Sequence, residues 1–130
     1  MIREELVNPK IQYFLAQIDD TYVGYAKLEE RPPAPCVKKT HSIYLGRLYL
    51  VKGAQGAGLG SRLLEEVYAE ARLRQAQWIW LSVWENNYGA LDFYIKRGFT
   101  RVGEWDWPFE SLGKRYVDLD YIMIGQIPKA

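Results

Sequence analysis

The chain has 130 residues, of which 48% are hydrophobic and 25% are charged, and its formal net charge is +1. This length and composition predict one globular domain over residues 1–130, and the near-neutral charge argues against a nucleic-acid partner. No apolar run approaches the ~20 residues of a membrane span, and the first residues do not resemble a signal peptide. A single cysteine, Cys36, excludes an internal disulfide and favours a cytoplasmic location.

The first half of the chain predicts three strands. A short helix or turn is expected over residues 3–6, ended by Asn8 and Pro9. Residues 11–18 and 22–29 are rich in aliphatic and aromatic side chains and read as strands joined by a turn. Residues 31–40 contain three prolines and predict a loop, and residues 42–51 predict the third strand.

The third strand runs into a glycine-rich turn that opens a helix. Glycine permits positive φ and a close approach of the backbone to a ligand, and the N–H groups of a helix start attract an anion. A P-loop is excluded because Ser61-Arg62 follows the last glycine, and the glycine spacing does not fit a dinucleotide fingerprint. Two interpretations of this turn remain open. Its backbone binds the pyrophosphate of another kind of ligand, or the glycines only allow close packing. The residues concerned are Gln55, Gly56, Ala57, Gly58, Gly60 and Ser61.

The second half of the chain predicts two helices and three strands. Apolar residues at helical spacing predict a helix from Leu59 to about Gln75, and residues 78–84 predict a buried strand. Residues 87–97 predict a second helix with Asn87 as its N-cap and Gly98 as its αL C-terminal residue. With the third strand, these elements predict a right-handed βαβ unit.

The chain closes with a predicted pair of strands over residues 100–107 and 115–124, joined by a loop through Pro108 and Gly113. The complete order is therefore ββ-β-α-β-α-β-β, an α/β chain with a mixed sheet.

Two segments together resemble the GNAT superfamily of N-acetyltransferases. The turn matches the pattern Q/R-x-x-G-x-G/A, and the second helix matches N-x-x-A-x-x-x-Y-x-x-x-G-F through Asn87, Ala90, Tyr94, Gly98 and Phe99. The resemblance implies the GNAT acyl-CoA N-acyltransferase fold, a three-layer αβα arrangement. It starts at the family's second strand, so an N-terminally shortened form is expected. The sheet edge formed by residues 11–18 would then be exposed, which predicts a homo-oligomer.

The resemblance also implies a reaction, the direct transfer of an acetyl group from acetyl-CoA, as co-substrate, to a primary amine. Carried over residue by residue, it places the pantetheine amides at the backbone of Leu50 and Val51. It places the pyrophosphate at residues 55–61 and the pantetheine arm near Asn87. It makes Tyr94 the acid that protonates the leaving thiolate, although a plain core role for this tyrosine remains open.

One residue departs from the family pattern. Many relatives carry a glutamate where this chain has Gly46, so the general base is not assigned; Glu85, Glu29, Tyr44 or a water chain are the candidates. A catalytically impaired acetyl-CoA-binding sensor or partner-binding module is therefore the alternative function.

The acceptor is left open between a small molecule and a peptide. Residues 83–87 and 116–123 resemble most the branch that acetylates polyamines such as spermidine. An aromatic and acidic acceptor wall can form from Trp84, Trp105 and Trp107 with Glu104, Asp106 and Glu110, or these residues only pack the last strand pair. Cys36 and the single histidine, His41, read as loop residues, and no metal site is expected.

Overall fold

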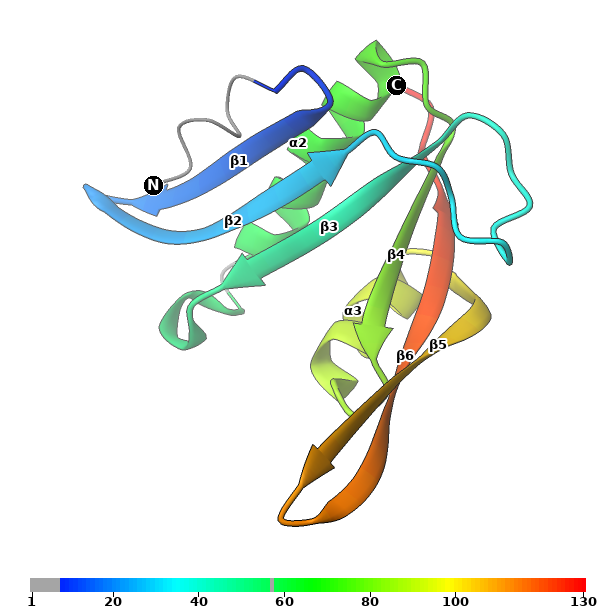
Figure 1. Ribbon diagram of the computed structural model, residues 1–130. Coiled ribbons are helices and arrows are strands. Elements are labelled where there is room, and N and C mark those ends of the chain that lie inside the picture. The colour runs from blue at the N-terminus through cyan, green and yellow to red at the C-terminus, as the bar shows by residue number, and fades with distance from the viewer. Residues whose placement is uncertain (1–7, 57) are drawn as a thin grey trace.

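The computed structural model describes residues 8–56 and 58–130, so the helix or turn predicted over residues 3–6 lies outside the described residues. Six strands and two α-helices form the described part (Figure 1). In chain order they are β1 (Ile11–Ile18), β2 (Thr21–Glu29), β3 (Ser42–Leu50), the 3₁₀ turn η1 (Lys52–Ala54), α2 (Leu59–Leu73), β4 (Trp78–Trp84), α3 (Tyr88–Lys96), β5 (Thr100–Ser111) and β6 (Lys114–Gln126).

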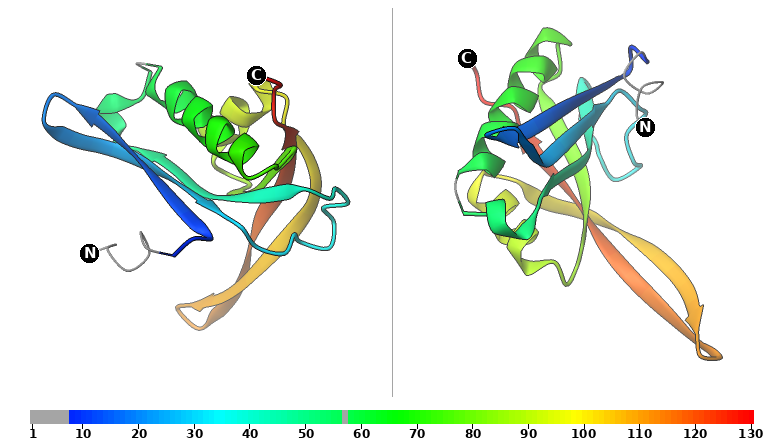
Figure 2. Two further views of the ribbon diagram at one scale, coloured as in Figure 1. Left: turned by 90° about the horizontal axis from the view of Figure 1, so that it is seen from above. Right: turned by 90° about the vertical axis from the view of Figure 1, so that its left-hand side faces the viewer.

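The strands form one mixed sheet in the order β1-β2-β3-β4-β6-β5. All neighbours are antiparallel except β3 and β4, which are parallel and are connected through α2. Both helices lie on the same face of this sheet (Figure 2). The mixed α/β class is confirmed, and the described residues supply the sheet and one helical layer of the three-layer arrangement.

Successive side chains along the strands point to opposite faces of the sheet, and apolar side chains form a separate cluster on each face. On the helix-covered face, residues such as Ala26, Ile79 and Leu81 pack with Leu64 and Val67 of α2. On the opposite face, the proline-rich loop packs Ala34 and Val37 against Trp80, Ile122 and Ile124. This period of two is the physical reason that β4 can contribute to both clusters.

The helix ends follow the predicted signals. Asn87 caps α3, since its Oδ1 accepts from the Ala90 N–H at 3.2 Å, and Gly98 takes the left-handed φ of +87°. Helix α2 ends at Leu73, two residues before the predicted end, because Gln75 adopts a φ of +64° that no helix continues.

The last strand pair differs from the prediction. Pro108 lies inside β5 rather than in the loop, and the strands continue to a two-residue turn at Leu112 and Gly113, both with positive φ. A proline is tolerated here because β5 is an edge strand of the sheet. The long hairpin projects beyond the body of the protein (Figures 1 and 2).

The described residues lack two kinds of feature. None of their helices is both long and apolar enough to cross a membrane. Within the same residues, no cluster of histidine, cysteine, aspartate or glutamate has the composition of a metal site.

Candidate active site

The parallel strands β3 and β4 separate after a short contact. They pair only from Ser42 with Trp78 to Tyr44 with Trp80, although both strands continue beyond that point. A backbone edge is thereby opened in the middle of the sheet, as the family resemblance implies. The open edge of β3 carries Leu48 and Leu50, both of which line a cleft of about 510 Å³.

The direction of the backbone groups identifies which residues face this gap. The Val51 N–H donates to the Val23 carbonyl at 2.8 Å, so Val51 points toward β2. Bonded and non-bonded positions alternate along an antiparallel pair, and the register is regular from Gly24 to Lys27. Leu50 and Leu48 therefore direct their backbone groups away from β2 and into the gap.

This geometry bears on the predicted role of Val51. Its N–H is bonded to Val23, and its carbonyl accepts from the Ala54 N–H at 2.9 Å as part of η1. Both backbone groups that would meet a pantetheine amide are thus engaged within the protein. Leu48, which the sequence pattern did not single out, directs its backbone N–H and C=O into the gap instead. This follows only from the β2–β3 register.

The glycine turn leaves the start of α2 open to a ligand. Gly56 and Gly58 adopt φ values of +88° and +76°, and a Cβ at either would meet no atom within 4 Å. Gly58 is the N-cap without a side-chain bond, and no acidic residue stands in the first turn. The first N–H groups of the helix are therefore free of a side-chain cap, which is the arrangement that binds anions.

Two neighbouring residues fix the shape of the turn. The Gln55 side-chain amide donates to the Leu50 carbonyl at 3.3 Å and closes the turn onto the end of β3. Gly60 has a packing role, since a Cβ there would lie 3.1 Å from the Phe93 ring. Gly60 thus lets α2 and α3 approach closely at the cleft.

The cleft brings together eight of the predicted residues. These are Leu50, Gln55, Gly56, Gly58, Gly60, Ser61, Asn87 and Tyr94. Ala57 lies outside the described residues, and Val51 is not among the described residues that line the cleft. Leu48, Gly89, Phe93 and Arg97 also line it and were not predicted as site residues.

Tyr94 is buried at the floor of the cleft, with 7% of its surface exposed. Its ring packs against Phe99 with the centroids 5.3 Å apart. Burial, with a smaller contribution from the nearby Tyr68, raises the pKa of Tyr94 well above its ordinary value. A tyrosine in this state keeps its proton at neutral pH, so it can donate a proton but is a poor base.

Arg97 is a cation that the sequence indicated only as a helix-end residue. It lines the cleft, donates to the Phe93 carbonyl at 2.9 Å and contacts the Ser61 hydroxyl. Its guanidinium carbon lies 3.6 Å from the centroid of the Phe93 ring. These contacts hold one positive charge beside the open end of α2, where an anion would bind.

Gly46 occupies a β-bulge, because Lys27 pairs with Arg47 whereas Leu28 pairs with Leu45. A Cβ at Gly46 would meet only ordinary contacts, the nearest being the Tyr44 ring at 3.4 Å. The glycine is therefore not required by the backbone. Of the candidate bases, Tyr44 is the one shown to border Gly46.

The predicted acceptor wall lies mostly on β5 of the projecting hairpin, and Trp84 lies at the end of the neighbouring β4. Trp105 and Trp107 stack with centroids 5.6 Å apart, and the Trp107 indole donates to Asp120 at 3.1 Å. The Trp84 indole donates to Asp118 at 3.3 Å. Glu104 pairs with Arg101, and Glu110 lies 3.9 Å from Arg115. These contacts lie within the hairpin or join it to β4, and the role of the wall toward an acceptor stays a prediction.

Comparison with known proteins gives consistent results. The model of the Acetyltransferase (GNAT) family matches residues 2–99. An uncharacterized N-acetyltransferase of Lactobacillus delbrueckii is 32% identical over 100 residues, which is 77% of this chain and 58% of that protein. The N-alpha-acetyltransferase RimI of Mycobacterium tuberculosis is 37% identical over 76% of this chain and 58% of its own length. The chain thus spans less than two thirds of these relatives.

A third relative and one solved structure extend the comparison. A spermine/spermidine N(1)-acetyltransferase of Bacillus subtilis is 32% identical over 69% of this chain and 60% of that protein. The fold matches that of a putative streptothricin acetyltransferase from Bacillus anthracis in complex with acetyl coenzyme A. That match has a TM-score of 0.79 at 19% identity and covers 98% of this chain and 69% of the other.

Proposed function

We propose, because the chain belongs to the GNAT family of acetyltransferases, that it transfers the acetyl group of acetyl-CoA to a primary amine. One observation supports this most directly. The cleft between the separated strands β3 and β4 contains free strand backbone, an open helix start and a buried, protonated tyrosine. These are the three kinds of group that a thioester of a phosphate-bearing carrier requires.

We assign different parts of the co-substrate to different residues of the cleft. We assign the pyrophosphate to residues 55–61 and the start of α2, with Arg97 as an additional cation. We place the pantetheine amides against the backbone N–H and C=O of Leu48 and the N–H of Leu50, which have no β4 partner at this level; the Leu50 carbonyl already accepts from Gln55. Asn87 lies at the same cleft and, because its Oδ1 already caps α3, offers its amide N–H groups to the pantetheine arm.

The reaction is a direct transfer. The neutral amine nitrogen attacks the carbonyl carbon of the thioester, a C–N bond forms, and the C–S bond breaks. The departing CoA thiolate takes a proton from Tyr94, which is protonated at neutral pH, and Tyr94 then regains a proton from solvent. The amine gives up its own proton to solvent or to one of the candidate bases, of which the structure selects none.

The acceptor class is a separate question. Relatives are named for spermine and spermidine and for N-alpha acetylation, so both a polyamine and a peptide amine have support. The polyamine branch, a cytoplasmic location and a homo-oligomer stay predictions of the sequence. The edge strand β1, which pairs only with β2 in the described sheet, is compatible with the last of these.

The release of free thiol from acetyl-CoA across a panel of primary amines tests the activity. We expect amine-dependent thiol release and CoA binding by calorimetry. Gly46, in place of the usual glutamate, favours a second candidate, an acetyl-CoA-binding module without turnover. Tight CoA binding with no thiol release on any amine would support that candidate, and absence of CoA binding would contradict both.

A further inference from the structure

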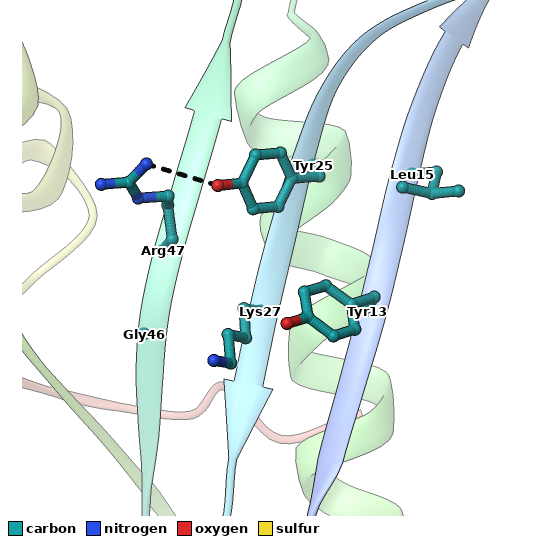
Figure 3. A pocket seen from close by; sticks show the side chains of 6 residues that line it. All are labelled: Tyr13, Leu15, Tyr25, Lys27, Gly46 and Arg47. Carbon is teal, nitrogen blue, oxygen red and sulfur yellow. Dashed lines mark hydrogen bonds between the residues drawn. The ribbon is translucent and has the colours of Figure 1, made fainter. Parts of the chain in front are cut away.

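A second cavity of about 340 Å³ lies beside Gly46, on the face of the sheet turned away from α2 (Figure 3). Tyr13 and Leu15 of β1, Tyr25 and Lys27 of β2, and Gly46 and Arg47 of β3 line it. Its volume is that of a small-molecule site, and aromatic and aliphatic side chains form its apolar part. Its charged part consists of two cations, Lys27 and Arg47.

Strand register brings these two cations together. Lys27 lies directly opposite Arg47 on β3 and opposite Tyr13 on β1. Like charges placed directly opposite in a sheet repel each other and destabilise it. A pair of this kind is therefore expected where an anion binds between the two charges.

Among the described residues, the contacts of these two cations are with neutral side chains. Arg47 donates to the Tyr25 hydroxyl at 3.3 Å, and the Lys27 ammonium lies 5.8 Å from the centroid of the Tyr13 ring. No ion pair found within residues 8–56 and 58–130 includes Lys27 or Arg47. Within this described part, the positive charge of the cavity is not compensated.

The cavity adjoins the cleft assigned to acetyl-CoA. Gly46 and Arg47 line the cavity, and the next residue, Leu48, lines the cleft. The separation of β3 and β4 begins just before these residues, beyond Tyr44, so the β3–β4 ladder is absent at this level. The cavity therefore lies beside the strand segment that lines the cleft.

We propose that this cavity binds the acceptor and that Lys27 and Arg47 hold a carboxylate of it. The inference rests on the proposed acetyl transfer and names its substrate class: a small primary amine with a carboxylate a few bonds from the nitrogen. A polyamine would bring further positive charge toward two cations, and such like-charge contacts select against a ligand.

Three acceptors of matched length separate the classes. These are 4-aminobutanoate, its amide 4-aminobutanamide, and 1,4-diaminobutane, to be compared with an α-amino acid and its amide in the same thiol-release assay. We expect kcat/KM to be about tenfold or more higher for each carboxylate than for its amide, and lowest for the diamine. A diamine that is used as well as the carboxylates would overturn the proposal.

A binding measurement makes the inference testable without turnover. The N-acetylated products of 4-aminobutanoate and of its amide are titrated into the protein in the presence of CoA. Tighter binding of the carboxylate by about tenfold supports the proposal. Equal binding overturns it, even if acetyl transfer itself is confirmed. Loss of all CoA binding would instead contradict the proposed function.

Variants locate the effect in the cavity. Lys27→Gln and Arg47→Gln should each reduce the ratio of kcat/KM for carboxylate over amide about tenfold. Lys39→Gln is the matched control, because its ammonium also lies over an aromatic ring, 4.5 Å from the Trp78 centroid, but Lys39 does not line the cavity. An unchanged preference in both cavity variants would contradict the assignment.

Discussion

Two of the strand edges in the described sheet that lack a ladder partner, one on β3 and one on β1, differ in what surrounds them. The edge of β3 beyond Tyr44 lies inside the sheet, next to a glycine turn, a helix start and the buried Tyr94. The edge of β1 lies at the outside of the sheet, and among the described residues no member of β1 lines the cleft assigned to acetyl-CoA. An inner edge of this kind gives up backbone hydrogen bonds to make room for a ligand, whereas an outer edge is a place for another strand.

Filling the inner edge should have the largest effect. Gly89 lines the cleft, its φ is not positive, and a Cβ there would meet no atom within 4 Å. We expect Gly89→Trp to weaken CoA binding by about 100-fold or more, ~3 kcal/mol, because the indole occupies the space of the ligand. Calorimetry with CoA measures this.

The control for this variant is Gly89→Ala, which adds a methyl group in open space and removes a helix-weakening glycine. It should bind CoA nearly as well as the unmodified chain. Bulky residues at Gly58 or Gly60 are less informative, since Gly58 needs its positive φ and Gly60 contacts Phe93. Full CoA affinity in a folded Gly89→Trp protein would place the ligand elsewhere.

Removing the proton donor tests the chemistry at the same edge. Tyr94→Phe should lower kcat by roughly 10²-fold and leave CoA binding almost unchanged, because only the proton transfer is lost. Tyr68→Phe is the control: Tyr68 is also a buried tyrosine with a raised pKa, but it does not line the cleft within the described residues. A full-rate Tyr94→Phe enzyme would return Tyr94 to a packing role.

The pH dependence sharpens the same assignment. A raised pKa means that Tyr94 stays protonated beyond pH 10, so its acid function is present throughout the neutral and mildly alkaline range. The acceptor amine must lose a proton, with a free pKa of about 10.4 for a lysine-type amine. The rate should therefore rise with pH up to about pH 10. A descending limb near pH 8 that disappears in Tyr94→Phe would contradict the raised pKa.

A smaller effect is expected at the mouth of the cleft. Arg97→Gln should weaken CoA binding about tenfold, the loss of roughly one charge-assisted hydrogen bond to phosphate. Lys96→Gln is the control from the same helix end, because Lys96 is exposed and pairs with Asp92 at 3.0 Å. Equal effects of the two variants would mean that only the general charge of α3 matters.

Much of the fold was predictable because the signals are local. The strands Ile11–Ile18 and Trp78–Trp84 have the predicted bounds, since aliphatic and aromatic runs end at clear turn residues. The N-cap Asn87 and the αL residue Gly98 were predicted from capping chemistry alone. The prediction was wrong at Pro108. A proline is excluded from a central strand but tolerated in an edge strand, and which strand lies at the edge depends on the order of the whole sheet.

The candidate site was predictable only where a motif is contiguous. The glycine turn and Tyr94 were identified from patterns, and the structure places them at one cleft. The roles of Leu48, Lys27 and Arg47 depend on register and on the bulge at Gly46, neither of which a single sequence specifies. Arg97 carries an ordinary helix-end signal, so its position beside Ser61 is visible only in three dimensions.

The outer edge gives the last prediction, on assembly rather than on the reaction. Strand β1 contains neither a charged residue nor a proline, whereas the opposite edge strand β5 carries Pro108 and several charges, the usual protections against pairing. We therefore expect a homodimer through β1 at micromolar concentration in sedimentation experiments. Ile18→Lys, which adds a charge at the exposed end of β1, should shift the equilibrium toward monomer by a few-fold, and Val117→Lys on the hairpin should not. A monomer of 15.2 kDa that acetylates amines at full rate would contradict the dimer. The edge of β1 would then need no partner for activity, in contrast to the inner edge of β3, to which we assign the ligand.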